Sequence, residues 1–234
     1  MALLTLLVGT ALATAPPTER KVAVGVGAFF NAGGTFMTQP SDLTHPQVAE
    51  LPFSGWAGFS PGGGVSFDVR FFDAVGLEID VIRSIDQAQS EYTINTQDIR
   101  FGVTTPSWHI PILLKGGIPS KGVSPNIFVG ALVVAPGQVD FPDVPGVPWE
   151  MTAQTSTYTR FMFGFGFEGR LPIDGVDLRI PFAIRGALAP GYPSAAVDRA
   201  TYDITTDNVL LSMDYDLRWQ YHAGVTLGVS YYFL

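Results

Sequence analysis

The chain has 234 residues, a length that fits one large domain or two small ones. Hydrophobic residues make up 47% of it and charged residues only 15%, which is more apolar than a typical soluble domain. The formal net charge of −8 argues against nucleic acid as a partner, and the lack of cysteine excludes disulfide bonds and thiolate metal sites.

No stretch of the sequence reaches the ~18 consecutive apolar residues that a membrane-spanning helix needs. A closed β-barrel is the other structure that satisfies every backbone polar group in lipid, and its apolar residues need only alternate along each strand. The 26 glycines and 18 prolines also favour strands and turns over helices. The composition therefore favours a closed β-barrel.

Residues 1–13 have the features of a signal peptide. An apolar run ends on small residues in the arrangement Ala11-Leu12-Ala13, which is typical of a cleavage site. We expect cleavage after Ala13 and a single barrel domain over residues 14–234. Because no Lys or Arg precedes the apolar run, the alternative is a buried strand or short helix at the start of a soluble domain.

The rest of the chain alternates with the period of two that is typical of strands. In most predicted strands, apolar residues take alternate positions, and small or charged residues lie between them. Residues 126–134 are apolar on both faces, and their length and flanking turns predict a strand there. We expect Phe161, Phe163, Phe165 and Phe167 to face lipid, and Arg160 and Glu168 to face inward. In chain order the predicted strands cover residues 21–30, 65–71, 75–81, about 99–114, 126–134, 161–167, 178–184 and 220–233.

These segments predict an all-β fold, a single antiparallel up-and-down transmembrane β-barrel of eight strands. Connectors around 72–74, 116–125 and 172–175 are short, whereas those around 31–60, 85–100, 136–156 and 189–208 are long. Short periplasmic turns and long outer loops are the barrel arrangement, and an even strand count leaves both termini in the periplasm.

Two segments interrupt the strand pattern of this barrel. The alternation changes phase between Val103 and Trp108, which predicts a bulge near 104–106, or a turn there and a ten-stranded barrel. Pro111 and Pro181 each lack a backbone donor and are expected to mark bulges.

The hairpin between the sixth and seventh strands has an even number of loop residues, because the two strands alternate with opposite parity. A four-residue turn at 172–175 would set Glu168 opposite Arg179 and Arg170 opposite Asp177. A six-residue loop would instead set Arg170 opposite Arg179. Charge favours the first register.

The end of the chain, 225–234, resembles the C-terminal assembly signal of bacterial outer-membrane barrels. Residues 108–115, Trp-His-Ile-Pro-Ile-Leu-Leu-Lys, are similar to the Ile-Pro strand of small outer-membrane β-barrel proteins of the OmpA/OmpX-like group. The resemblance implies export to the outer membrane of a Gram-negative envelope, contact with its lipid and lipopolysaccharide, and assembly by the barrel-assembly machinery. The implied signal residues are Val225, Leu227, Val229, Tyr231 and Phe233. This group shares a fold rather than a function.

The inward charges are the main candidate site. Because burying an unpaired charge is expensive, they predict a structural salt-bridge network that plugs the barrel. The alternative is a small-solute pore whose charges set ion preference. The predicted lumen charges are Asp68, Arg70, Glu78, Asp80, Arg160, Glu168, Arg170, Arg179 and Arg185.

Signals for enzyme, cofactor or metal chemistry are weak. The Gly-x-Gly-x-x-Gly at 164–169 lies within a strand pattern and does not open a helix. Barrel deacylases use His-x-Ser, and none of His45, His109 and His222 has Ser two positions on. A lipid-modifying or protease-like barrel enzyme stays the third hypothesis. We therefore expect no cofactor, no metal and no catalytic residue.

The outer loops are the second candidate site. They are predicted to expose acidic residues, Asp86 and Asp140 among them, beside aromatic ones such as Phe59 and Phe141. Loops on a rigid scaffold commonly carry binding function. The preferred hypothesis is a non-enzymatic structural or interaction protein that acts through these extracellular loops on a surface partner.

Overall fold

The computed structural model of the chain describes residues 21–37, 56–94, 97–141, 149–173, 176–189, 197–205, 208–216 and 220–233. The predicted signal peptide lies outside these residues. The strands are β1 (Val22–Met37), β2 (Trp56–Phe71), β3 (Val75–Ile94), β4 (Gln97–Gly117), β5 (Val123–Pro136), β6 (Trp149–Gln154), β7 (Tyr158–Ile173), β8 (Val176–Leu188), β9 (Val197–Thr205), β10 (Asn208–Asp216) and β11 (Tyr221–Phe233).

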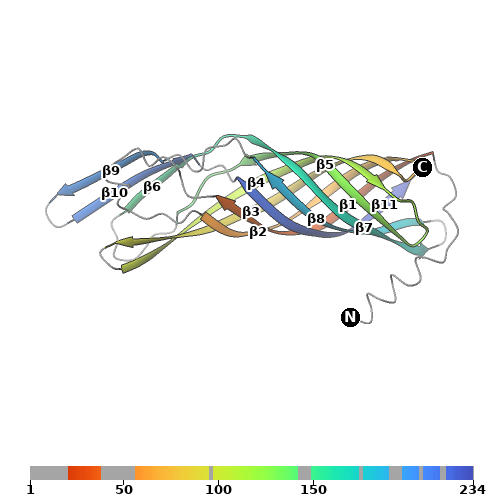
Figure 1. Ribbon diagram of the computed structural model, residues 1–234, viewed down its shortest axis with the longest axis horizontal. Helices are drawn as coiled ribbons and strands as arrows, with labels where there is room; N and C mark the ends of the chain where they lie inside the picture. The colour runs from red at the N-terminus through yellow and green to blue at the C-terminus, as the bar shows by residue number, and fades with distance from the viewer. Residues whose placement is uncertain are drawn as a thin grey trace.

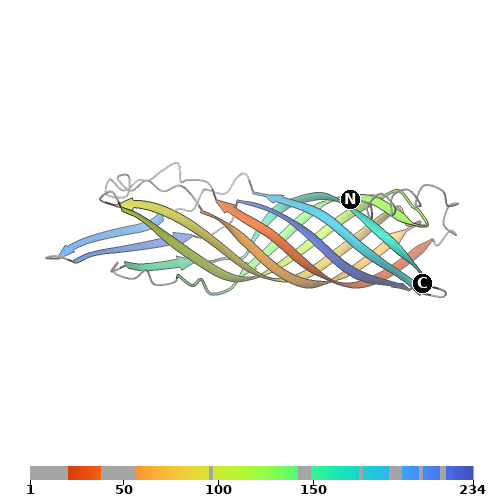
Figure 2. The same cartoon turned by 90° about the horizontal axis from the view of Figure 1, so that it is seen from below.

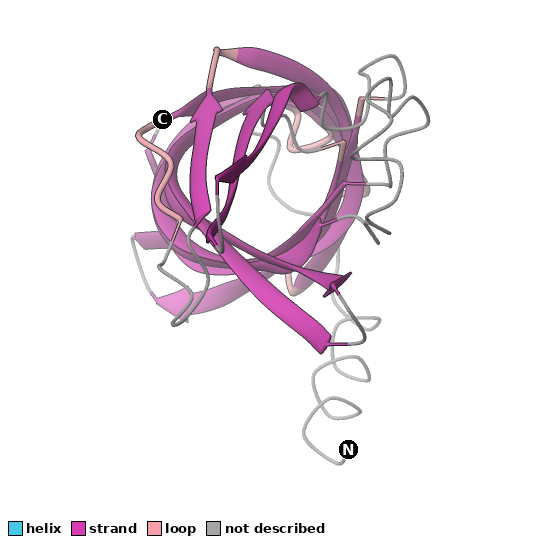
Figure 3. Cartoon of the chain, turned by 90° about the vertical axis from the view of Figure 1, so that its left-hand side faces the viewer, coloured by secondary structure: helices cyan, strands magenta, loops and turns pink. Residues whose placement is uncertain are grey.

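Eight of these strands close into one antiparallel barrel, as predicted. Around the barrel the order is β1-β11-β8-β7-β5-β4-β3-β2, so each barrel strand pairs with the barrel strands before and after it in the chain. The closed ring is visible in the end-on view of Figure 3. Among the described residues, no helix is long and apolar enough to cross a bilayer.

The register of the barrel fixes its shape. Following paired residues once around from Val24, through the seven other strands, leads back to β1 at Gly34, ten residues farther along. This offset tilts the strands by roughly 40° to the barrel axis and leaves an interior that side chains can fill. The tilt is visible in Figure 2.

The polarity of the barrel is inverted relative to a soluble protein. Phe161, Phe163, Phe165 and Phe167 are 44–51% exposed on the outside, whereas Arg160, Glu168 and Arg179 are 1–3% exposed on the inside. The predicted exposure of these seven side chains is confirmed. A soluble β-sandwich would bury the phenylalanines instead.

One end of the barrel carries its short connections. The start of β1 pairs with the end of β11, Val24 with Phe233, and the β2–β3, β4–β5 and β7–β8 turns lie at the same end. At the other end, β3 and β4 continue as a hairpin to Ile94 and Gln97, past Gln89, the last β3 residue paired with β2. The predicted loop at 85–100 is therefore mostly strand.

Two further segments predicted as loops also contain strands. β6 lies within 136–156, and β9 lies within 189–208; with β10 they form a three-stranded sheet in the order β6-β10-β9. This sheet lies beyond the barrel at the end away from the C-terminus (Figure 1). The pairing of β6 with β10 is parallel and joins two segments far apart in the sequence.

The predicted irregularities in β4 and β8 are absent. Val103 is 1% exposed and faces the lumen, so its inward position has the same odd parity as that of His109, with no bulge between them. The register is also unshifted across Pro111 and Pro181, although no pairing is formed where β3 passes Pro111 or where β11 passes Pro181. Each proline lacks a backbone N–H donor, and here the result is a gap in the hydrogen bonds between two strands rather than a bulge with an inserted residue.

The predicted register of the β7–β8 hairpin is wrong. Arg170 pairs with Arg179, and Glu168 pairs with Pro181. Ile173 pairs with Val176, so only two residues separate the strands. Those residues are Asp174-Gly175, a pair typical of two-residue hairpins, and this signal outweighs the charge argument.

Candidate functional site

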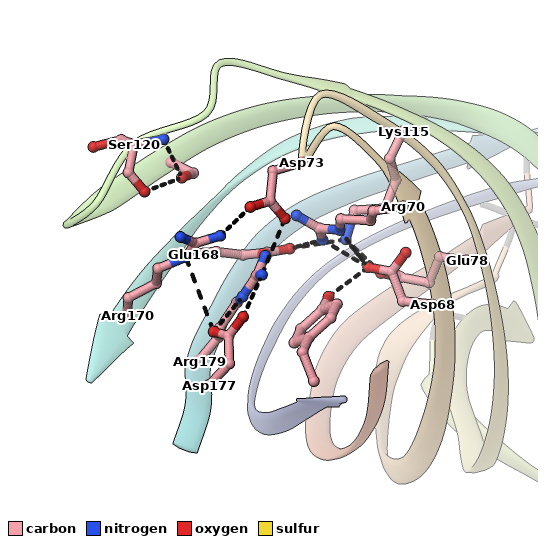
Figure 4. Close-up of polar contacts among 12 residues, drawn as sticks. Asp68, Arg70, Asp73, Glu78, Lys115, Ser120, Glu168, Arg170, Asp177 and Arg179 are labelled. Atoms are coloured by element: carbon pink, nitrogen blue, oxygen red, sulfur yellow. Dashed lines mark hydrogen bonds and ion pairs between the residues drawn. The ribbon is translucent and has the colours of Figure 1, made fainter. Parts of the chain in front are cut away.

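The lumen holds an inner cluster of charged and polar side chains from six strands, near the end that carries the short turns. Its centre is Lys115 on β4. The Nζ atom of Lys115 lies 2.5 Å from Glu78 Oε2, 3.0 Å from Glu168 Oε1 and 3.5 Å from Asp68 Oδ2 (Figure 4). We define the inner cluster as Asp68, Arg70, Glu78, Asp80, Lys115, Glu168, Arg185 and Tyr232.

Arginines complete this inner cluster on both sides of Lys115. Arg70 donates to Asp68, at 2.6 Å, and to Glu168. The Tyr232 hydroxyl donates to Asp68 Oδ2 at 2.6 Å. Every one of these side chains is buried, and each charge faces an opposite one, as buried ions require.

Arg185 extends the inner cluster toward the middle of the barrel. Its guanidinium lies 2.8 Å from Glu78 Oε1 and also pairs with Asp80. The rings of Phe29 and Phe128 lie 5.5 and 5.6 Å from it, within cation–π range. Arg185 on β8 and Glu78 on β3 thereby connect strands on different sides of the barrel.

A second group, the turn cluster of Asp73, Arg170, Asp177 and Arg179, closes the end with the short turns. Asp73 accepts hydrogen bonds from Arg170 and from Arg179 Nη2, the latter at 3.0 Å (Figure 4). Asp177 accepts two more from Arg179, at 2.8 and 3.0 Å. Two carboxylates thus neutralise the directly paired Arg170 and Arg179, which explains why that register is tolerated.

The geometry of the β2–β3 turn places Asp73 in the turn cluster. Phe72 and Asp73 have φ of 54° and 55°, and Ala74 N donates to Phe71 O at 3.0 Å, so the turn has two consecutive left-handed residues. Burial by itself would raise the pKa of Asp73. The charge of Arg179 and the hydrogen bonds from Arg170 outweigh burial and hold that pKa below its usual value of 3.8.

An outer cluster lies farther along the lumen, around Asp86. Its Oδ2 lies 3.0 Å from His109 Nε2, and its Oδ1 accepts hydrogen bonds from Ser60 at 2.7 Å and Ser84 at 2.9 Å. The ring of His222 meets that of His109 edge-on at 5.7 Å. The sequence placed Asp86 in an exposed loop, but it is fully buried in the lumen.

The outer cluster does not have the geometry of a catalytic triad. Ser60 and Ser84 donate to the carboxylate of Asp86, on the side away from His109, whereas a triad needs the serine beside the histidine. These two serines, Asp86 and His109 are each at most 2% exposed. Among the described residues, no three His, Asp or Glu side chains are grouped to hold a metal ion.

Arg160 is the exception among the predicted lumen charges. It is 1% exposed, and its Nη2 donates to the Tyr158 hydroxyl at 2.7 Å. Its Nε and Nη1 have no hydrogen-bond partner within the described part of the chain. The other eight predicted lumen residues each form an ion pair in the inner cluster or the turn cluster.

Sequence reasoning missed several members of these clusters, although strand parity marks some of them. Lys115 continues the odd-numbered inward positions of β4, and Asp86 continues the even-numbered ones of β3. Tyr232 follows the same rule on β11. Asp73 and Asp177 could not be found this way, because they depend on the turn and on the register beside it.

The packed lumen leaves little free space at the inner cluster. The cavity lined by Asp68, Glu78, Lys115 and Glu168 has a volume of about 30 Å³, room for about two water molecules. A second cavity, below Lys115 and beside Asp73, has about 10 Å³. At this level the lumen is therefore occupied by salt-bridged side chains with small cavities among them.

The residues of the predicted assembly signal all lie on the outward face of β11. Val225, Leu227, Val229, Tyr231 and Phe233 are 40–55% exposed. β11 pairs with β1 on one side and β8 on the other, so it is the strand that closes the barrel.

Comparisons with known proteins point to the same fold. No family model matches the chain, and no curated protein sequence matches it significantly. The structure is similar to the outer membrane protein OprG of Pseudomonas aeruginosa, with a TM-score of 0.50 at 8% identity over 92% of this chain and 97% of OprG. This similarity shows a shared barrel fold.

Two other solved barrels resemble the chain less closely. The N-terminal β-barrel domain of OprF from Pseudomonas aeruginosa has a TM-score of 0.38 at 12% identity, covering 92% of this chain and all of that domain. Ail, the attachment invasion locus protein of Yersinia pestis, has a TM-score of 0.36 at 12% identity, with the same coverage.

Proposed function

We propose that the chain is an integral outer-membrane β-barrel protein without enzymatic activity, whose barrel is a closed anchor for the strands and loops at its outer end. The observation that carries the proposal is the inverted polarity of the barrel. Its exterior is apolar, and its interior holds buried ion pairs. A closed barrel with this polarity is one of the two structures that satisfy all backbone groups in lipid.

The packed inner cluster favours an anchor over a small-solute pore. A conducting lumen needs a continuous water path, but Lys115 and Arg185 link carboxylates on several strands across the interior. The arrangement around Asp86 gives no support to a lipid-modifying enzyme, because Ser60 and Ser84 donate to Asp86 rather than to a histidine.

The outer end supports an interaction role. The β3–β4 hairpin and the sheet of β6, β9 and β10 extend beyond the barrel on the side opposite the chain's C-terminus (Figure 2). We infer that these elements are extracellular and present a surface to a partner. The membrane partners of the barrel are outer-membrane lipid, including lipopolysaccharide, and its assembly partner is the barrel-assembly machinery.

The proposal is tested by locating the native protein. Expressed with its own N-terminus in a Gram-negative host, it should fractionate with the outer membrane, start at Thr14 by mass spectrometry, and migrate faster on unheated than on heated SDS gels. Recovery of the chain from the cytosol with Met1 retained would refute the proposal.

A further inference from the structure

Arg83 is a charged residue among apolar neighbours on the outer face of the barrel. It lies on β3, and the residues two positions before and after it, Val81 and Ile85, are 39% and 44% exposed. Its directly paired neighbours are Gly63 on β2 and Trp108 on β4. Every neighbouring side chain on this face is therefore apolar or absent.

The protein offers Arg83 an aromatic ring but no opposite charge. The guanidinium lies 5.2 Å from the centre of the Trp108 ring, and Trp108 is itself 46% exposed. No ion pair of Arg83 is found in the described part of the chain. An arginine stacked on one face of an indole keeps its hydrogen-bond donors free for a planar or tetrahedral anion.

The height of Arg83 along the barrel places it near the outer boundary of the apolar band. It lies eight residues along β3 from Val75, where the strand leaves its short turn. With a rise of ~3.3 Å per residue and a tilt of roughly 40°, this is about 20 Å from that end. Outer-membrane barrels carry an apolar band of roughly 25 Å bounded by aromatic residues.

Small residues leave room beside Arg83. Gly63 separates it from Phe30 on β1, which is 81% exposed, so the outward row across four strands reads Phe30, Gly63, Arg83 and Trp108. A Cβ atom at Gly63 would meet no atom closer than 3.4 Å, so the exterior is uncovered there. A cation between two exposed aromatic rings, with open space between, suits a ligand that is anionic at one end and apolar at the other.

We propose that Arg83 binds the phosphate of an outer-leaflet lipid, with Trp108 holding the guanidinium at headgroup level and the acyl chains passing over Gly63 against Phe30. The inference rests on the proposed membrane location, because the phosphate is that of a lipid. A basic side chain at this depth is tolerated because its counter-charge comes from the membrane rather than from the protein.

The test compares the Arg83→Gln variant with the wild type by native mass spectrometry of the detergent-solubilised chain. The probe is lipid A, with phosphatidylcholine as the neutral reference. Arg83→Gln should weaken lipid A binding by roughly fivefold to tenfold, the loss expected for one charge-assisted contact at a partly exposed site. Arg83→Lys should fall between, because it keeps the charge but loses the planar stack.

Two controls separate this site from general charge attraction. Arg100→Gln removes the charge of a different exposed arginine, which lies on β4. This variant should bind lipid A within twofold of the wild type (an allowance of roughly 0.4 kcal/mol). Millimolar inorganic phosphate should not displace lipid A, because a free anion lacks the acyl chains. Equal loss in Arg83→Gln and Arg100→Gln, or displacement by phosphate, would overturn the proposal.

Failure of the lipid site can be distinguished from failure of the proposed function. A wild-type chain that inserts into phosphatidylcholine vesicles supports the membrane barrel whatever Arg83 binds. If the wild type inserts but Arg83→Gln binds lipid A unchanged, only the lipid site fails. If the wild type does not insert, the membrane location itself is wrong.

Discussion

Two buried arginines of the lumen, Arg185 and Arg160, differ in what surrounds their guanidinium groups. Arg185 pairs with Glu78 and Asp80 and lies within 6 Å of two phenylalanine rings. Among the described residues, the contacts of Arg160 are with the hydroxyl and the ring of Tyr158. Removing one partner of a buried ion pair costs about 3–5 kcal/mol, because the other charge is left unpaired. Removing a charge that has no partner does not incur that cost.

Arg185→Met should therefore destabilise the barrel by about 3–5 kcal/mol, whereas Arg160→Met should change stability by less than about 1 kcal/mol or increase it. Both free energies of unfolding can be measured by urea titration in lipid vesicles. Methionine matches the length of the apolar stem in both variants, so cavity effects are comparable. Equal losses at the two positions would contradict the assignment of ion pairs in the lumen.

Asp73 is expected to make the stability of the folded barrel depend on pH. It lies in the β2–β3 turn, outside the membrane-spanning strands, and its pKa is lowered in the folded state. A lowered pKa means that its stabilising contribution is fully present above the unfolded value, near 3.8, and is lost as the pH falls through the folded value.

Asp73→Asn should reduce stability at pH 7 by on the order of 1–3 kcal/mol, because it removes the charge from two arginine hydrogen bonds. The difference between variant and wild type should shrink as the pH drops below about 4, since Asp73 then takes up a proton itself. Unfolding curves of both proteins at pH 7, 5 and 3 provide the check. A constant difference at all three would show that Asp73 does not act as a carboxylate.

At the scale of the element, the outward face of β7 should tolerate charge according to depth. Phe165 lies near the middle of its strand and is 46% exposed, whereas Phe36, 41% exposed, lies near the outer end of β1. Phe165→Arg should cost about 2–4 kcal/mol, and Phe36→Arg about 0–1 kcal/mol. The measurement is again unfolding in vesicles, and a larger loss at Phe36 would mean that the apolar band is placed wrongly.

Strand parity explains which elements the sequence could predict. Alternation identified seven of the eight barrel strands and the inward or outward face of β7, because an entire face must meet lipid or ions at once. β5 is apolar on both faces, and its length and flanking turns identified it instead. It failed at the ends of strands, as in the β3–β4 hairpin, because strands beyond the apolar band no longer need alternating polarity. Alternation also did not reveal β6 and β9, which pair outside the barrel.

The β7–β8 register shows why local charge pairing was a poor guide. The prediction compared only charged residues of this one hairpin, so the hairpin itself appeared to be decisive. The residues that neutralise Arg170 and Arg179 are Asp73, which arrives from a different hairpin about a hundred positions earlier, and Asp177, beside the turn. Contacts across a lumen depend on the closed barrel, and no pair of adjacent strands contains them.

For the molecule as a whole, the packed lumen predicts that the purified protein does not conduct. In planar bilayers the wild type should give no stable single-channel steps, because the inner cluster blocks the path. The double variant Glu78→Ala, Lys115→Ala removes two linked members of the inner cluster and should produce small, resolvable steps. Steady conductance by the wild type at neutral pH would show that the lumen is open and would favour the pore.

The ion pair between Arg185 and Glu78 joins residues 107 positions apart, on two strands that face each other across the ring closed by β11 and β1. Until β11 pairs with β1, we expect the charges of the inner cluster to stay hydrated. An incompletely closed sheet would then enter the bilayer with water still bound to these charges. Insertion and dehydration of the interior are therefore expected to occur together in one late step. The chain would then pass from an open, wet sheet to a sealed barrel without a stable dry intermediate.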